Sequence, residues 1–314
     1  MLKTVVKKTF DEERALYGAE NIRLEDCVFD GPADGESALK ESSGVEAVNC
    51  DFRLRYPLWH VRGGSLRNCR MTQTCRAALW YCRDISAENC EMNGIKALRE
   101  CDGTVIWKCS AESPEFGWLC RGIKISDSSL VSEYPFFMSR NITADNFRMK
   151  GKYSFQYAEN VVITNSYLDT KDAFWHSRNV TVTDSVIKGE YLAWYSEGLR
   201  LIRCKIIGTQ PLCYAKGLVL EDCETEGCDL AFERSEVNAT LKGISTASKI
   251  PFRGESRSPM SERSFSKRAL TAVKSTLRDG KTPCPPPNSG VFGLMNVRAA
   301  FIYERIFRNE RKRK

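Results

Sequence analysis

The sequence predicts an all-β protein: a single parallel β-helix of about 11 to 12 coils, followed by a basic tail. Two observations predict it. A short phrase recurs about every 19 residues, and every copy has the same order of residue types. The phrase is clearest in "RNCRM" and "ENCEM", where Cys69 and Cys90 follow an asparagine. Self-similarity at such a period indicates a solenoid, in which each coil packs on its neighbours.

Each copy can be aligned on one anchor residue, numbered zero here. The anchors are Cys27, Cys50, Cys69, Cys90, Cys109, Ser128, Phe147, Ser166, Ser185, Cys204 and Cys223. From position 109 to position 223 the spacing is 19 every time, and a partial further copy begins at Val237. We therefore expect one β-helix domain over residues 1–243.

The residue types within a copy predict short strands joined by tight corners. Positions −5 and −3 are apolar or small, as in Ile123 and Ile125, which is the period-two alternation of a strand. Position −1 is usually Asn or Asp and position −6 is usually Gly or Asn, which favour left-handed corners. Leucine-rich repeats have a similar length, but the leucine-dense consensus that they need is missing.

The anchor position predicts a buried packing slot. The chain has 14 cysteines, and Cys, Ser and Phe interchange at the anchor without any Cys-x-x-Cys spacing. We therefore expect free thiols, no metal site and no cofactor. The start "MLKTVVKKTFDEER" lacks the apolar segment of a signal peptide, and we expect a cytoplasmic protein.

The third strand of each coil is expected 13 to 8 residues before the anchor, in segments such as "YPLWHV", "DAFWHS" and "YLAWYS". Two registers are possible, because a slip of one residue exchanges the two faces of a strand. Inward positions −11 and −9 would bury His60, His176 and Glu233, which is costly for charged groups without partners. We therefore expect positions −12, −10 and −8 inward and positions −13, −11 and −9 outward.

This register predicts an exposed aromatic patch on three successive coils. Its outward residues are Tyr153, Phe155, Tyr157, Asp172, Phe174, His176, Tyr191, Ala193 and Tyr195. At about 4.8 Å between coils and 6.6 Å between alternate residues, the patch measures roughly 10 by 13 Å. We expect it to bind a carbohydrate or similar polar ligand through Tyr153, Tyr157, Asp172, Phe174, His176, Tyr191 and Tyr195. The alternative is that the stacked rings only stabilise the coils.

The segment "DGESALKES" lies in the longest gap between anchors, from Cys27 to Cys50. Glu36 and Lys40, with Glu41, are expected either to contribute to a ligand site or to cap the end of the helix.

Catalysis has little support in the sequence. Glu100 and Glu233 belong to coils seven apart, about 34 Å, which is too far for a glycosidase pair. Asp172 and His176 would lie about 13 Å apart along one strand, too far for direct contact. A carbohydrate-active lyase or hydrolase stays an alternative function, and a structural or protein-interaction scaffold is a third.

Several phrases resemble an uncharacterised bacterial family of unknown function with a pectin-lyase-like fold. They include "DGESALKES", "YPLWH", "DAFWHS", "GEYLAWYS", "PLCYA" and "LAFERS", and the resemblance covers Thr9 to about Gly243. It implies a right-handed parallel β-helix and carries no catalytic residue over to this chain. The Asp clusters of polygalacturonases and the calcium site of pectate lyases are not visible here.

Residues 244–314 form a basic tail that departs from the repeat. They hold 16 Lys and Arg against 5 Asp and Glu, a net charge of +11, so the β-helix itself carries −4 of the total +7. We therefore expect no nucleic-acid binding on the β-helix body and no membrane partner. The tail is predicted to be disordered. Our hypothesis is a frameshift near Gly243, since permitted codons read two bases later spell an ending like that of the family. The DNA sequence tests this directly.

Overall fold

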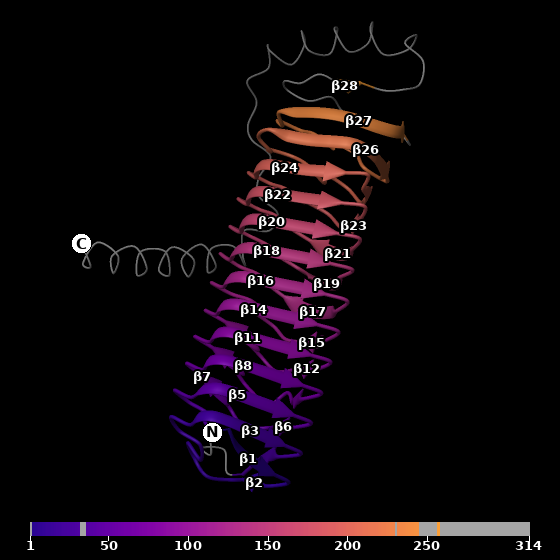
Figure 1. Ribbon diagram of the computed structural model, residues 1–314. Helices are drawn as coiled ribbons and strands as arrows, with labels where there is room; N and C mark the ends of the chain where they lie inside the picture. Colours follow the sequence, from indigo (N-terminus) through magenta and orange to yellow (C-terminus); the bar gives the residue numbers. More distant parts are fainter. Residues whose placement is uncertain (1, 32–35, 230, 245–255, 258–314) are drawn as a thin grey trace, which may run out of the picture. The chain divides into compact units, whose positions relative to one another are not determined.

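The structure, a computed structural model, describes residues 2–31, 36–229, 231–244 and 256–257. In these residues the chain forms a parallel β-solenoid of about twelve coils, without any α-helix (Figure 1). The all-β parallel fold and the repeat of about 19 residues are therefore confirmed. The start of the predicted tail is described only to Ile244 and at Ser256–Arg257, so the predicted tail lies almost wholly outside the described residues.

The first side of each coil carries strands that stack in parallel, with equivalent residues opposite each other. For example, Ile123 lies opposite Ile142 and Val161 opposite Val180. The strands are β1 (Lys3–Val6), β3 (Glu20–Glu25), β5 (Ser43–Val48), β8 (Arg62–Arg67), β11 (Arg83–Glu88), β14 (Asp102–Trp107), β16 (Arg121–Ser126), β18 (Arg140–Asp145), β20 (Glu159–Thr164), β22 (Arg178–Thr183), β24 (Glu197–Ile202), β26 (Leu218–Glu226) and β27 (Val237–Ile244).

The second side carries shorter strands, and the third side is mostly turns. The second-side strands are β2 (Thr9–Phe10), β4 (Val28–Phe29), β6 (Asp51–Phe52), β9 (Arg70–Met71), β12 (Glu91–Met92), β15 (Ser110–Glu112), β17 (Ser129–Glu133), β19 (Arg148–Lys152), β21 (Tyr167–Lys171), β23 (Val186–Lys188) and β25 (Lys205–Ile207). The third side has only β7 (Leu58–Trp59), β10 (Leu79–Trp80) and β13 (Leu98–Arg99). A final strand, β28 (Ser256–Arg257), pairs with β27.

One coil was missed by the sequence pattern. Strands β1 and β2 form it, and β1 pairs in parallel with β3. Lys7 takes the left-handed corner conformation with φ 52°, and Lys8 stands at the anchor position. Two lysines in place of an Asn/Asp corner and a Cys/Ser anchor hid this copy of the repeat. The Lys8 ammonium lies 4.7 Å from the centre of the Phe10 ring and so covers the end of the core.

The corners follow the predicted chemistry. Position −1 is left-handed in successive coils, with φ 54° at Asn49, 53° at Asn68 and 51° at Asn89. The amide of Asn89 donates to Asn68 at 2.8 Å, and that of Asn68 donates to Asn49 at 3.1 Å. Asparagine therefore supplies both the backbone conformation and a bond to the next coil.

Asn68→Ala is expected to lower the free energy of unfolding by about 1–2 kcal/mol, because alanine disfavours the left-handed conformation and loses both side-chain bonds. Asn68→Gly is the matched control, since glycine adopts this conformation freely and loses only the bonds. Denaturant unfolding of the three proteins measures the difference. Equal losses for alanine and glycine would contradict the corner account.

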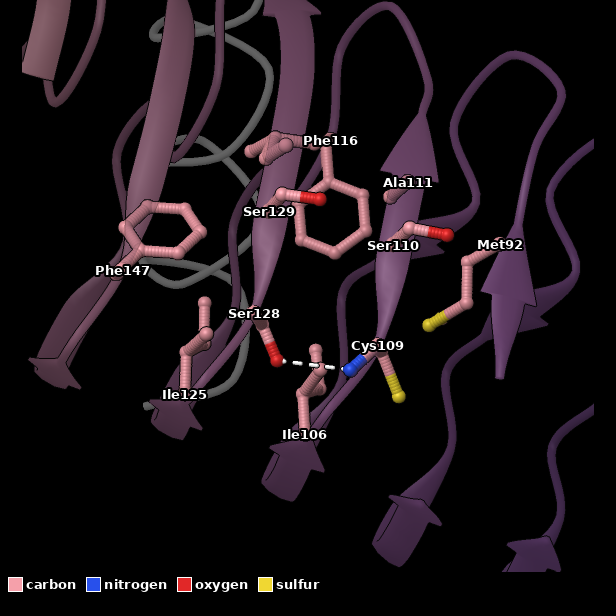
Figure 2. A pocket seen from close by; sticks show the side chains of 11 residues that line it. Met92, Ile106, Cys109, Ser110, Ala111, Phe116, Ile125, Ser128, Ser129 and Phe147 are labelled. Atoms are coloured by element: carbon pink, nitrogen blue, oxygen red, sulfur yellow. Dashed lines mark hydrogen bonds between the residues drawn. The ribbon is translucent and has the colours of Figure 1, made fainter. Parts of the chain in front are cut away.

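The anchor slot is buried, and its hydrogen bonds explain why cysteine and serine interchange there. The Cys69 N–H donates to the Cys90 sulfur at 3.4 Å, and the Cys90 N–H donates to the Cys109 sulfur at 3.3 Å. In the next coil the Cys109 N–H donates to the Ser128 hydroxyl at 3.0 Å (Figure 2). The slot therefore favours a small side chain that accepts one bond from the preceding coil.

The thiols of the described residues are all free. They are Cys27, Cys50, Cys69, Cys75, Cys82, Cys90, Cys101, Cys109, Cys120, Cys204, Cys213, Cys223 and Cys228, and every one is buried. Burial raises the pKa of the Cys75, Cys82 and Cys120 thiols, which keeps them neutral.

The interior leaves little room for a ligand. A cavity of about 10 Å³ lies between Met92, Cys109, Phe116 and Ser128 (Figure 2). That is about the space of one water-sized sphere. This cavity is therefore too small for a sugar unit.

Candidate functional site

The third side shows that the predicted register is partly wrong. Phe155, Phe174 and Ala193, which were expected to face outward at position −11, are 0–1% exposed. Phe155 stacks on Phe136 and Phe174 at centroid distances of 4.8 and 5.4 Å. Phe174 is therefore a core residue, and we withdraw it from the predicted ligand site.

Backbone conformation explains the error. Positions −13, −11 and −9 all have left-handed φ in these coils, with 57° at Tyr153, 57° at Phe155 and 56° at Tyr157. Side chains alternate between faces only in an extended strand, so this chain does not follow the period of two. Positions −12, −11 and −8 point inward and position −9 points outward, while position −10 is nearly buried at Gln156 and Trp175, with 7% and 8% exposure. Position −13 is only partly exposed, and the structure buries Asp172 there, which was expected to face outward. The column of Leu and Phe at position −11 was the signal in the sequence.

Four residues at position −9 form the column that we call the tip row: Tyr157, His176, Tyr195 and Tyr214. The first three are exposed, and Tyr214 is half-buried. Tyr157 is 41% exposed and Tyr195 is 50% exposed. Ring centroids are 4.8 Å apart from Tyr157 to His176, 5.1 Å from His176 to Tyr195 and 5.4 Å from Tyr195 to Tyr214. The first two pairs are nearly parallel, at 6° and 14°.

This stacking decides what the tip row can offer to a ligand. Nearly parallel rings about 5 Å apart cover each other's faces. The ring edges, with the phenol hydroxyls and the imidazole nitrogens, therefore face the solvent. Tyr214 was missed as a site residue, although its coil carries the quoted phrase "PLCYA".

The tip row is uncharged near pH 7. Burial lowers the pKa of His176, so its imidazole is neutral. Burial raises the pKa of Tyr157, and burial is also the largest cause that raises the pKa of Tyr214. Phenols stay protonated at this pH in any case. The row thus presents groups that both donate and accept hydrogen bonds.

The other predicted residues lie in a separate column at position −13. Tyr153 stacks on Tyr134 at 4.4 Å, and Asp172 and Tyr191 follow in the next two coils. Beside them, Lys152 pairs with Glu133 at 2.8 Å. The structure therefore divides the predicted patch: Tyr157, His176 and Tyr195 belong to the tip row, and Tyr153, Asp172 and Tyr191 do not.

Asp172 is the only charged side chain that is buried among the described residues, with 5% exposure. Burial raises the pKa of its carboxyl to about 6, an effect that the neighbouring Lys171 and Lys152 oppose and Glu190 reinforces. Lys171 itself is paired with Glu190 at 2.8 Å. A carboxyl with such a pKa has the properties of a general acid or base, but Asp172 does not line the cavity between Met92 and Phe147.

Two tryptophans at position −10, which was expected to face inward, lie between the columns. Trp175 is buried with 8% exposure, and Trp194 is half-buried. Trp175 and Trp194 stack at 5.2 Å and 8°. The Trp175 indole donates to the Tyr191 carbonyl at 2.6 Å, and Trp194 contacts Tyr214 edge-on at 5.5 Å. They connect the −13 column to the tip row.

A second aromatic group, which we call the lower cluster, lies in earlier coils. It consists of Tyr56, Trp59, His60, Trp80 and Tyr81. Trp59 and Trp80 stack at 5.2 Å, and the His60 and Tyr81 rings meet edge-on at 5.0 Å. Tyr81 is 41% exposed, like Tyr157 in the tip row.

Charged residues close both ends of the lower cluster. The Lys40 ammonium lies 3.9 Å from the centre of a Trp59 ring, and Glu41 contacts the His60 imidazole at 3.2 Å. At the other end, burial and then the nearby Glu100 raise the pKa of Tyr81 to about 12. Charged side chains of the protein therefore flank the tips of this cluster, which indicates a structural role.

The predicted loop contribution is not brought to the ligand residues. Glu36 pairs with Arg55 at 2.8 Å, and Lys40 covers Trp59. Lys40 lies six coils before Tyr157, roughly 29 Å along the axis. Part of this loop, residues 32–35, lies outside the described residues.

The described part of the chain contains no group of three His, Cys, Asp or Glu side chains that could hold a metal ion. Among the same residues, no helix has the length and apolarity needed to cross a membrane.

Comparison with known protein families finds one that matches most of the chain. A family model described as "Protein of unknown function (DUF3737)" matches residues 3–272. No curated protein matches the chain.

Three of the solved structures that match this chain are described by identity, TM-score and the share of each chain covered. The A-module of mannuronan C-5 epimerase AlgE4 from Azotobacter vinelandii is 9% identical, with a TM-score of 0.33, over 79% of this chain and 91% of that one. PfbA, a surface adhesin of Streptococcus pneumoniae, is 10% identical, with a TM-score of 0.31, over 77% and 74%. The catalytic domain of a GH87 α-1,3-glucanase, in complex with nigerose, is 10% identical, with a TM-score of 0.25, over 81% and 57%. Identity at this level carries no site residue over to this chain.

Proposed function

The chain belongs to the DUF3737 family, and we propose that it binds an oligosaccharide or a similar polar ligand along the tip row. The observation that carries the proposal is the tip row itself: four neutral, hydrogen-bonding rings at intervals of one coil, three of them exposed and Tyr214 half-buried. Protein sites that recognise sugars need several placed donors and acceptors, and this row supplies them on a rigid support.

Binding by this row depends on ring edges rather than ring faces. A sugar stacked flat on Tyr195 would have to replace His176 or Tyr214, which already lie 5.1 and 5.4 Å away. Hydroxyl-to-hydroxyl bonds need no such rearrangement. Each bond of this kind contributes a net 0.5–1.5 kcal/mol, about a two- to tenfold change in affinity.

The contrast with the lower cluster supports this assignment. Tyr81 stands at the same position in the repeat as Tyr157 and is equally exposed, but the Glu100 carboxylate lies near it and helps to raise its pKa. The column neighbours of Tyr157 and Tyr195 are rings instead of carboxylates. The tip row therefore presents neutral groups to a ligand, whereas charged groups flank the lower cluster.

We propose a cytoplasmic location, which the thiols of the described residues support. The thirteen cysteines within the described residues are all free, as expected in a reducing compartment. This compartment favours a soluble intracellular glycan over an extracellular polysaccharide as the ligand.

A glycan-binding screen on the full chain tests the proposal. Tyr195→Ala is expected to weaken binding of any hit at least tenfold, because it removes one tip and unstacks the two rings beside it. Tyr81→Ala in the lower cluster is the matched control and is expected to leave the affinity unchanged.

The outcomes separate the three functions. Loss of binding in both variants would place the site elsewhere or indicate unfolding, which the unfolding midpoint distinguishes. A folded protein that binds no glycan would support the scaffold function. A hit that the protein also cleaves would support the lyase or hydrolase alternative.

A further inference from the structure

We infer that the ligand of the tip row is a linear, uncharged oligosaccharide, which lies along the solenoid axis over about four coils with one sugar unit per coil. This inference rests on the proposed function and specifies its ligand class. Three features of the structure carry it: the spacing of the row, the charge around it and its two ends.

The spacing of the tip row matches a linear sugar chain. Successive rings are 4.8, 5.1 and 5.4 Å apart. This repeat is close to the length of one pyranose unit in an extended chain. Each unit of such a chain would then meet one new hydroxyl or imidazole edge, and no unit would need to bend away from the surface.

The charges beside the row are already paired with one another. On the neighbouring first-side strands, Glu159 lies 3.4 Å from Arg140 and 3.9 Å from Arg178. Glu197 continues the series, 3.6 Å from Arg178 and 3.8 Å from Lys216. Cations and anions alternate from coil to coil, so the flank of the tip row offers no field that would favour an acidic polymer.

Both ends of the row are defined by a change of residue type at position −9. One coil before Tyr157 this position holds Met138, which is half-buried and carries no hydrogen-bond donor. One coil after Tyr214 the count reaches Glu233, but the chain is shifted by one residue there, and the equivalent left-handed residue is Arg234 with φ 54°. Its guanidinium lies 5.9 Å from the Tyr214 ring centre. Neutral tips therefore span four coils, which sets the expected length of the bound segment.

Calorimetric titration of the full chain with oligosaccharides of one to six units tests the inference. Cello-, manno- and xylo-oligosaccharides are the neutral linear probes, and galacturonic acid oligomers are the acidic ones. For at least one neutral series, the affinity is expected to rise about two- to tenfold with each unit up to four and then to level off.

The variant Tyr214→Phe removes the last tip but keeps its ring. It is expected to move the plateau from four units to three, whereas Tyr81→Phe in the lower cluster leaves the plateau at four. A purely structural role of Tyr214 would leave the dependence on length unchanged.

The failures of the two proposals are distinguishable. Equal affinity for one and four units, or tighter binding of the acidic oligomers, would overturn the inference and leave the proposed site standing. Binding only of branched glycans in the screen would do the same. Absence of binding to every glycan would overturn both.

Discussion

Replacing Phe155 with alanine is expected to lower the free energy of unfolding by about 3–5 kcal/mol, the usual cost of removing a buried phenylalanine. Phe155 is fully buried and stacks between Phe136 and Phe174. The surrounding coils are held by inter-coil hydrogen bonds, such as Phe155 N–H to the Pro135 carbonyl at 2.9 Å, and cannot close the gap freely. Denaturant unfolding followed by circular dichroism measures the loss.

Tyr157→Ala is the control, two residues along the same turn. Its side chain is 41% exposed, so the expected change is about 1 kcal/mol, mainly from lost ring contacts. Solenoids can open locally, so hydrogen exchange in this turn should be faster in the Phe155→Ala variant than in the Tyr157→Ala variant. A larger loss at Tyr157 than at Phe155 would contradict the inward assignment of position −11.

Asp172→Asn is expected to stabilise the protein at pH 8 by about 2–3 kcal/mol. The folded-state pKa of Asp172 is about 6, raised from an ordinary value of 3.8. The folded state therefore holds the proton more tightly than the unfolded state, and stability falls as the pH rises from about 4 through 6. A shift of about two pH units corresponds to about 3 kcal/mol once the carboxyl is fully charged.

The pH dependence of the difference between Asp172→Asn and the unchanged protein isolates this one group. The two proteins should have nearly equal free energies of unfolding at pH 4. The advantage of the variant should then grow up to about pH 7 and stay constant above it. A constant difference in the free energy of unfolding across this range would show that folding does not shift the pKa of the Asp172 carboxyl. A variant less stable at pH 8 would show that the charged form is stabilised by Lys171 and Lys152 more than burial disfavours it.

The coils and corners could be predicted from the sequence because they depend on local chemistry that repeats. Asparagine at position −1 predicts the left-handed corners at Asn49, Asn68 and Asn89. The alternating Ile123 and Ile125 predict a strand. The anchor slot was also predictable, since Cys109 and Ser128 have little in common except small size and the ability to accept a hydrogen bond.

The third side could not be predicted in the same way, because its backbone is not a strand. Tyr153, Phe155 and Tyr157 all have left-handed φ, which these bulky residues rarely adopt in isolation and which the neighbouring coils impose. Three of the seven predicted ligand residues lie in the tip row, because position −9 points outward in both descriptions. Tyr214 was missed because stacking between coils, which joins it to this surface, is a property of the assembled solenoid.

The most direct test of the central claim, that hydroxyl edges of the tip row hold the ligand, uses the double variant Tyr157→Phe/Tyr195→Phe. It keeps both rings and removes only two oxygen atoms. For a glycan found in the screen, the account predicts about a 10- to 100-fold loss of affinity by calorimetry, with an unchanged unfolding midpoint. An unchanged affinity in a folded double variant would contradict it.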